Sequence, residues 1–123
     1  ALLSGDAAAL PIRTSAVDVA VYVATLHHLP DRENRIRSLS EIARVLQPGG
    51  RALVSAWSTE HDRFEDHDEG FDTTVEWTLP GGETVDRFYH IYSPAEFAAD
   101  LERSDCSVGE RFVSSGNCYA MVR

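Results

Sequence analysis

Several side chains that form directed hydrogen bonds or carry charge stand at the borders of apolar segments in this chain. Asp6 lies in the segment GDAAALP (residues 5–11), and the pair His27-His28 closes an apolar run. A carboxylate accepts hydrogen bonds from amino groups, whereas histidine donates, accepts or changes charge near neutral pH. Followed by the turn QPGG (residues 47–50), this order is typical of the downstream half of a nucleotide-cofactor site whose glycine-rich half is missing.

The elements that must position these residues follow from hydrophobic periodicity. Residues 17–23 are Val, Ala and Tyr interrupted only by Asp18, which predicts a buried strand of a parallel sheet. Residues 32–47 have helical spacing of apolar side chains, with Asp31 as the predicted N-cap. The turn at 48–50 then ends the helix.

A second strand is predicted at residues 52–57. Too many residues separate it from the first strand for the two to form a hairpin. We therefore expect a right-handed parallel crossover. Ligands of such sheets bind beyond the carboxyl ends of the strands, and His27, His28 and Trp57 stand at those ends.

The remaining residues predict a hairpin, a helix and a terminal hairpin. Strands are expected at 73–79 and 84–92 around Pro80-Gly81-Gly82, within a substrate-side insertion spanning residues 58–92. Ser93, Pro94 and Glu96 form a capping-box pattern for a helix that reaches Arg103. Two antiparallel strands, at 107–113 and 117–122, then complete the sheet.

In their order and spacing, Asp6-Ala7, His27-His28 and Pro48-Gly49-Gly50 resemble the second half of a class I S-adenosylmethionine-dependent methyltransferase. The resemblance implies an α/β fold: the C-terminal part of a doubly wound, mostly parallel Rossmann-like sheet that ends in an antiparallel hairpin. It also implies that Asp6 and Ala7 bind the adenine of S-adenosyl-L-methionine, and that the backbone at Val23 and Ala24 lines its methionine end.

Three later segments indicate a more specific family within these methyltransferases. EWTLP (76–80), DRFYHIY (86–92) and GNCY (116–119), with the histidine pair, look like the tRNA wobble-uridine carboxymethyl methyltransferases. This family includes the methyltransferase domain fused to an AlkB-like oxygenase, and its members esterify the carboxylate of 5-carboxymethyluridine. The resemblance therefore implies the tRNA anticodon as a partner, together with a small zinc-binding activator subunit.

The methyl transfer that this resemblance implies depends on positioning the substrate carboxylate more than on moving a proton. A carboxylate with a pKa near ~4 is already ionised at neutral pH. Arg87 is expected to hold it in bidentate geometry, and His28 to assist as the second catalytic residue. His27, Trp57, Tyr89 and His90 are expected to bind the substrate by hydrogen bonds and stacking.

Each of these residues also has a purely structural interpretation. Asp6 fits a turn, the histidine pair fits a packed strand end, and Arg87 fits a cross-strand pair. The acidic residues between 61 and 72 have the chemistry of metal ligands but no recognised ligand spacing, so we expect a solvated loop and no metal site. A methyltransferase acting on a small molecule and a noncatalytic interaction module are the alternative functions.

Composition sets further expectations. The chain has 20 acidic and 11 basic residues, a net charge of -9 and no lysine, which suggests a halophilic source. This charge opposes long-range attraction to tRNA, although molar salt would shorten the Debye length to ~3 Å.

The chain as a whole, residues 1–123, is interpreted as a partial methyltransferase domain that lacks the glycine-rich cofactor half. We therefore predict a fragment of a longer enzyme that is inactive alone. Cys106 and Cys118 are expected to be reduced and buried in the two final strands. We expect neither a signal peptide nor a transmembrane stretch, and a cytoplasmic location is the default expectation.

Overall fold

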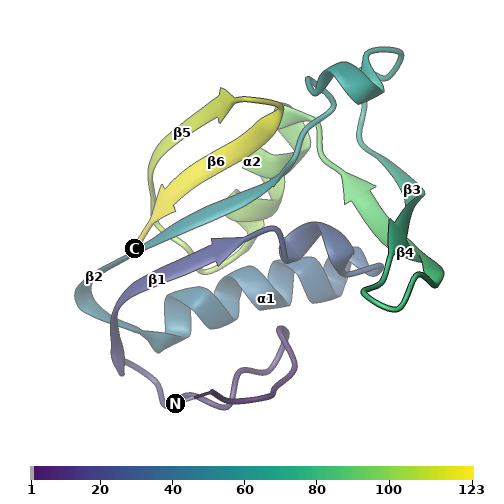
Figure 1. The fold of residues 1–123 in the computed structure, drawn as a ribbon. Helices are drawn as coiled ribbons and strands as arrows, with labels where there is room; N and C mark the ends of the chain where they lie inside the picture. The colour runs from purple at the N-terminus through teal and green to yellow at the C-terminus, as the bar shows by residue number, and fades with distance from the viewer. Residues whose placement is uncertain (1) are drawn as a thin grey trace.

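The computed structural model describes residues 2–123, and Figure 1 shows the arrangement of their elements. In chain order these are β1 (Val17–Val23), η1 (Leu26–His28), α1 (Arg32–Val45), β2 (Leu46–Trp57), η2 (Asp62–Phe64), β3 (Phe71–Thr78), β4 (Thr84–Ile91), α2 (Pro94–Arg103), β5 (Val108–Ser114) and β6 (Asn117–Val122). The two elements labelled η are single turns of 3-10 helix.

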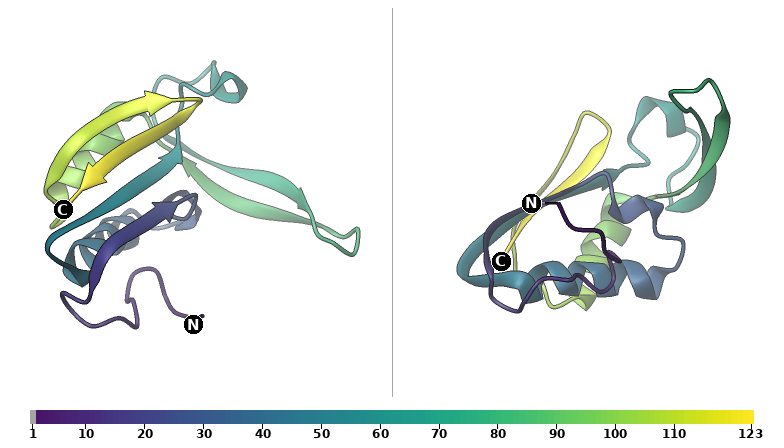
Figure 2. Two further views of the ribbon diagram at one scale, coloured as in Figure 1. Left: turned by 60° about the vertical axis from the view of Figure 1, so that its left-hand side comes forward. Right: turned by 60° about the horizontal axis from the view of Figure 1, so that its bottom comes forward.

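The main sheet is mixed. Its four strands lie in the order β1-β2-β6-β5. The β1–β2 pair is parallel, as the sequence predicts for the strand-helix-strand unit, whereas β2–β6 and β6–β5 are antiparallel. Strands β3 and β4 form a separate two-stranded antiparallel sheet, which projects away from the main sheet in the left view of Figure 2.

Both helices pack on the same face of the main sheet. One core cluster joins Leu39 of α1 and Phe97 of α2 to the inward-facing Val54 and Ala120 of the sheet. A doubly wound sheet needs helices on both faces, so within residues 2–123 the fold is a single-sided α/β layer pair. Of the arrangement expected from the sequence, the parallel β1–β2 pair and the terminal antiparallel hairpin are present in this part of the chain, whereas helices on both faces of a mostly parallel sheet are not.

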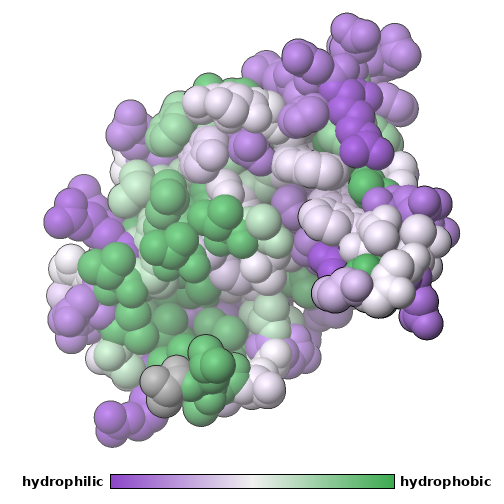
Figure 3. Space-filling view, in the orientation of Figure 1, coloured by the Kyte–Doolittle hydropathy of each residue, from purple (hydrophilic) through white to green (hydrophobic). Residues whose placement is uncertain are grey.

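Strand β1 is half-exposed rather than buried. Val19, Val21 and Val23 point to the face without helices, where their exposed fractions are 69%, 71% and 44%. Figure 3 shows the resulting apolar surface, in green, over this side of the sheet. The prediction of a buried strand was wrong here because the apolar run indicates which residues avoid water but not whether both faces of β1 are covered.

The helix boundaries follow from the predicted caps. The Asp31 carboxylate accepts a hydrogen bond from the Glu33 amide at 3.2 Å, and the Ser93 hydroxyl accepts one from the Glu96 amide at 3.1 Å. Helix α1 ends at Val45, two residues before the predicted end, because Leu46 is already extended and pairs with Val17 of β1. Neither helix, within residues 2–123, is long and apolar enough to cross a membrane.

A buried polar network joins the two helices. The hydroxyl of Tyr92 donates to Asp100 at 2.9 Å and accepts from Arg35 at 3.1 Å, and Arg32 pairs with the same Asp100 carboxylate at 2.7 Å. Burial, followed by the charge of Asp100, raises the pKa of Tyr92. Because every charged member has a partner, the network joins α1 to α2 without an unsatisfied buried charge.

The two cysteines are free thiols, as the sequence predicts. Cys118 lies buried in β6, where burial raises the pKa of its thiol to about 11. Cys106 precedes β5 instead of lying in it, and its thiol donates to the Leu39 carbonyl at 3.1 Å.

Candidate active site at the carboxyl ends of β1 and β2

An aromatic cluster forms where β1 and β2 end. Element η1 follows β1 and carries His27 and His28, Trp57 ends β2, and Tyr89 reaches the same point from β4. The Tyr89 ring lies 4.8 Å from His27, 4.4 Å from His28 and 4.6 Å from Trp57, centroid to centroid. The structure therefore brings together four of the residues that the sequence predicts for the site.

His27 is held as a neutral imidazole. The backbone N–H of Trp57 donates to Nδ1 of His27 at 3.0 Å, so the proton of the neutral ring is on Nε2. Burial, followed by the neighbouring His28, lowers the pKa of His27 to about 4. At neutral pH this side chain therefore offers a hydrogen-bond donor but no positive charge.

His28 is held in the opposite tautomer. Its Nδ1 lies 3.1 Å from the carbonyl oxygen of Phe88, which can only accept, so Nδ1 donates. In the neutral ring Nε2 is then an acceptor. The two adjacent imidazoles, 4.6 Å apart and nearly perpendicular, thus supply one donor and one acceptor, and a backbone contact from a different element fixes each tautomer.

Arg87 lies beside this cluster on the β3–β4 hairpin. It shares one face of the hairpin with Tyr89, two residues along β4, and both His28 and Arg87 line a cavity of about 340 Å³. The Arg87 guanidinium lies over the ring of Trp77, 4.7 Å from its centroid. The residue directly opposite Arg87 is Val75, and Trp77 lies on the same neighbouring strand, so Arg87 also makes the cross-strand contact of its structural interpretation.

Trp77 belongs to the site but was not among its predicted residues. Its indole N–H donates to the Tyr89 hydroxyl at 3.1 Å while its ring lies under Arg87. One indole therefore holds two of the predicted side chains. The register of the hairpin around Pro80-Gly81-Gly82 could have revealed this, because it places residues 77, 87 and 89 on one face.

His90 does not join the cluster. It points to the opposite face of the hairpin, where Nδ1 contacts Asp72 at 2.6 Å and Nε2 contacts Glu96 at 2.5 Å. Both ring nitrogens are thus already bonded within the protein. The structure does not bring His90 to the predicted substrate site, because successive side chains of a strand point to opposite faces.

The segment around Asp6 forms a turn on α1. One Asp6 carboxylate oxygen accepts from the Ala8 amide at 2.8 Å, as the turn interpretation of Asp6 requires, while the side chain stays exposed. The Ala7 carbonyl accepts from the Ser38 hydroxyl at 2.7 Å, and the Leu10 amide donates to Glu41 at 2.8 Å. Residues of α1 therefore fix the position of this segment.

A mostly apolar cavity of about 230 Å³ lies between this segment and β1. Its lining residues are Leu3, Gly5, Ala7, Leu10, Pro11, Ile12, Tyr22 and Thr25. At its β1 end the chain turns sharply, because Ala24 has a φ of 55°, a left-handed conformation that is uncommon for residues with a Cβ. Thr25 then connects this cavity, through Leu26, to the histidine pair.

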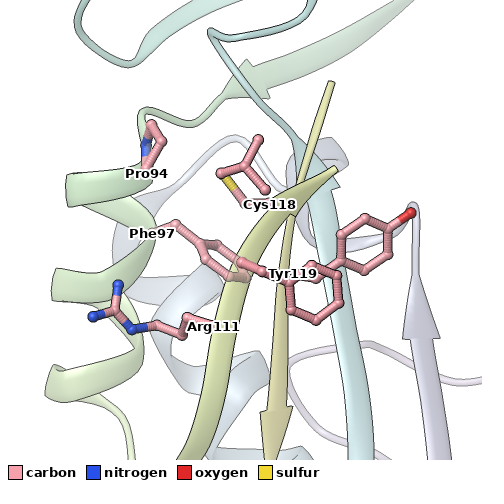
Figure 4. Close-up of a pocket in the computed structure, with 7 residues that line it drawn as sticks. Pro94, Phe97, Arg111, Cys118 and Tyr119 are labelled. Carbon is pink, nitrogen blue, oxygen red and sulfur yellow. The ribbon is translucent and has the colours of Figure 1, made fainter. Parts of the chain in front are cut away.

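A further cavity of about 170 Å³ lies between α2 and the β5–β6 hairpin, and Figure 4 shows its lining. The residues around it include Phe97, Arg111, Cys118 and Tyr119. Among residues 2–123, none of those predicted for the site lines this cavity.

The chain is similar in sequence to known methyltransferases. Residues 1–54 match the model of a methyltransferase domain family. The mouse "tRNA (carboxymethyluridine(34)-5-O)-methyltransferase ALKBH8" is 40% identical over 57 residues, which are 46% of this chain and 9% of that protein. The "Putative methyltransferase ECU09_1500" of Encephalitozoon cuniculi is 32% identical over 96 residues, 74% of this chain and 45% of that protein. The matched segments thus span less than half of these relatives.

Solved structures share the fold over nearly the whole chain. A S-adenosylmethionine-dependent methyltransferase from Clostridium acetobutylicum has a TM-score of 0.76 at 10% identity, covering 98% of this chain and 63% of that one. A DhpI–SAM–HEP complex has a TM-score of 0.64 at 27% identity, covering 98% and 55%. The predicted resemblance is therefore confirmed: residues 1–54 match a methyltransferase domain family, and the chain is similar to S-adenosylmethionine-dependent methyltransferases in sequence and in fold.

Proposed function

We propose that this chain forms the substrate-side part of an S-adenosylmethionine-dependent methyltransferase that esterifies the carboxylate of 5-carboxymethyluridine at the tRNA wobble position. The observation that carries this proposal is the convergence of His27, His28, Tyr89 and Arg87 at the carboxyl ends of β1 and β2. Ligands of α/β sheets bind beyond these strand ends.

The cofactor would occupy the cavity beside the Asp6 turn. An apolar lining suits the flat face of an adenine, and the exposed Asp6 carboxylate is a hydrogen-bond acceptor for its amino group. Ala7 would contribute its backbone, and Val23 and Ala24 would extend the site towards the histidine pair. When bound, S-adenosylmethionine supplies a methyl group on a positively charged sulfur.

The substrate carboxylate would be bound by side chains of the site at the carboxyl ends of β1 and β2. Arg87 can donate two parallel N–H groups to a carboxylate, and its guanidinium already lies over the Trp77 ring. His27, neutral with its proton on Nε2, can donate without attracting a proton from solvent. Because the carboxylate is ionised at neutral pH, these residues need to orient it and exclude water rather than remove a proton.

The base itself would be recognised by the aromatic cluster. The partly buried Trp57 ring and the exposed Trp77 ring are available for a flipped base to stack on, and the buried Tyr89 ring supports Trp57 by stacking. His28 offers an acceptor at Nε2, which suits an N–H group on the edge of a uracil. This arrangement supports a nucleobase carboxylate as the substrate class.

Methyl transfer to matched anticodon stem-loops tests the proposal. The full gene product that contains this chain is incubated with radiolabelled S-adenosylmethionine and a stem-loop carrying 5-carboxymethyluridine. Controls carry either unmodified uridine or the carboxamide analogue, which has the same size without the charge. We expect label only in the carboxylate stem-loop, released by mild base as an ester is. Equal labelling of the carboxamide, or no labelling of any stem-loop, would contradict the substrate assignment.

A methyltransferase that acts on a small molecule is the second candidate. The net charge of -9 favours it, because a net-negative protein gains nothing from long-range attraction to RNA. The 27% identity to the DhpI complex with SAM and HEP also favours it. The free nucleoside of 5-carboxymethyluridine separates the two candidates. A tRNA enzyme needs the stem-loop, whereas an enzyme for small molecules methylates the nucleoside with a similar kcat/KM.

A further inference from the structure

A buried histidine joins three elements of this protein through two carboxylates. Nδ1 of His90 on β4 contacts Asp72 of the adjacent strand β3 at 2.6 Å, and Nε2 contacts Glu96 of α2 at 2.5 Å. The side chain of His90 is 7% exposed, that of Glu96 25% and that of Asp72 61%. The hairpin is thereby tied to the first turn of α2 at the end of β4 nearest the main sheet.

The position of Glu96 is itself fixed. Its amide is bound to the Ser93 hydroxyl at the start of α2, and its carboxylate lies against Gly70. A Cβ at Gly70 would overlap that carboxylate, so glycine is needed there for the approach. Glu96 follows Ser93 at the capping-box spacing, but its carboxylate bonds to His90.

The two contacts together require a particular charge state. A neutral imidazole carries one N–H and can donate to only one of two carboxylates, leaving a lone pair facing the other. An imidazolium carries an N–H on both nitrogens and satisfies both carboxylates with charge-assisted hydrogen bonds. The two contacts of His90 are those of the protonated ring.

From this geometry we propose that Asp72, His90 and Glu96 form a pH-dependent anchor that holds the β3–β4 hairpin, and with it Arg87 and Tyr89, against α2. His90 is thus a positioning residue rather than the substrate ligand expected from the sequence. Its influence on substrate binding rests on the proposed function, whereas its influence on the hairpin does not.

The charged and titratable groups around His90 determine the direction of the effect. Burial disfavours the imidazolium, and the charge of Arg35 on α1 adds to this, but the hydrogen bonds to Glu96 and Asp72 outweigh both. The pKa of His90 is consequently raised. Tyr92, edge-on to His90 with centroids 4.8 Å apart, has a raised pKa and stays neutral. The anchor is complete below the ordinary histidine pKa and is lost as the pH rises through the raised one.

Tyr89 and Arg87 transmit the state of the anchor to the site. Tyr89 directly precedes His90 and points to the other face of β4, into the aromatic cluster, and Arg87 lies two residues further back. When the ring loses its proton, one of the two carboxylate contacts is lost. The hairpin is then held mainly by the packing of Tyr89 against Trp57 and the histidines.

Asp72→Asn is the variant of choice because the Asp72 side chain is largely exposed, so the fold should tolerate the change. Asp86→Asn is the matched control, since Asp86 is on the same face of the hairpin but pairs with Glu76. Amide hydrogen exchange, expressed as protection factors of the β4 residues, is measured on all three proteins at about pH 6 and about pH 8.5. NMR of the imidazole ring measures the protonation of His90 directly.

In the wild type we expect β4 protection factors to fall about tenfold between the lower and the higher pH, following the deprotonation of His90. Asp72→Asn should remove most of this difference and lower protection at the lower pH, and Asp86→Asn should behave as the wild type. A wild type without pH dependence, or an equal effect of Asp86→Asn, would overturn the anchor. Because exchange does not require methyl transfer, it tests the anchor even if the substrate proposal fails.

Discussion

Trp57 and Tyr89 stack with their ring centroids 4.6 Å apart and their planes 17° from parallel. This contact joins the last residue of β2 to the hairpin β3–β4, which otherwise forms a sheet of its own. Both histidines of η1 pack against the same Tyr89 ring. The candidate site therefore exists only while the hairpin stays docked.

Tyr89→Ala is expected to destabilise the protein by about 3–5 kcal/mol, because a buried aromatic ring is lost from the junction. Tyr89→Phe keeps the ring but leaves the Trp77 N–H without its acceptor, so a cost of about 1 kcal/mol is expected. Urea unfolding followed by tryptophan fluorescence measures both. Equal costs for the two variants would show that the hydroxyl, not the stacking, holds the hairpin.

Tyr92→Phe is expected to cost about 1–3 kcal/mol of unfolding free energy, because the buried Asp100 and Arg35 each lose a partner. Tyr119→Phe is the matched control, since Tyr119 is only partly buried and contributes mainly by stacking on Phe112. Its expected effect is within ~0.5 kcal/mol. Urea unfolding of the two variants should separate them clearly, and similar midpoints would contradict the role given to the network.

Alanine substitutions at three glycines distinguish the cost of backbone strain from the cost of steric overlap. Gly81→Ala meets open space and should change the stability by less than about 0.5 kcal/mol. Gly82→Ala also meets open space, but at a φ of 87°, and should cost about 1 kcal/mol. Gly116→Ala combines a φ of 77° with an overlap on the His61 ring and should cost more than about 2 kcal/mol. Thermal unfolding measures the series, and any other order would contradict it.

His27 is expected to remain neutral well into the acid range. Its pKa is lowered from 6.5 to about 4, so the unfolded chain binds the proton more readily than the folded one. The contribution of His27 to the unfolding free energy therefore decreases as the pH falls from 6.5 towards 4, opposite in sign to that of His90. NMR titration of the His27 ring measures this directly, and a midpoint near 6.5 would contradict its burial in the cluster.

Local sequence signals predicted the elements well. The bounds of β1, the caps at Asp31 and Ser93 and the two hairpins follow from periodicity, side-chain hydrogen bonding and turn residues, all of which act over a few positions. These local signals could not predict that helices cover only one face of the main sheet. Whether Val21 is covered depends on packing between distant segments, and an apolar run is the same in either case.

The structure brings most of the predicted site residues close together. The histidine pair and Trp57 were expected there from the strand ends, and Tyr89 and Arg87 from the family resemblance. His90 was assigned to the substrate because its segment, residues 86–92, resembles the tRNA methyltransferases. Successive side chains of a strand point to opposite faces, however, and His90 contacts Asp72 and Glu96 instead. The same alternation brings Trp77 under Arg87, a contact that only the hairpin register reveals.

The most direct test of the central claim, that Arg87 on the docked hairpin binds the substrate carboxylate, is saturation kinetics of the full gene product with Arg87→Lys. Arg111→Lys on the exposed strand β5 is the matched control. If Arg87 holds the carboxylate in bidentate geometry, kcat/KM falls by about 10- to 100-fold for Arg87→Lys and stays within about twofold for Arg111→Lys. Equal kcat/KM values for the two variants would contradict the claim.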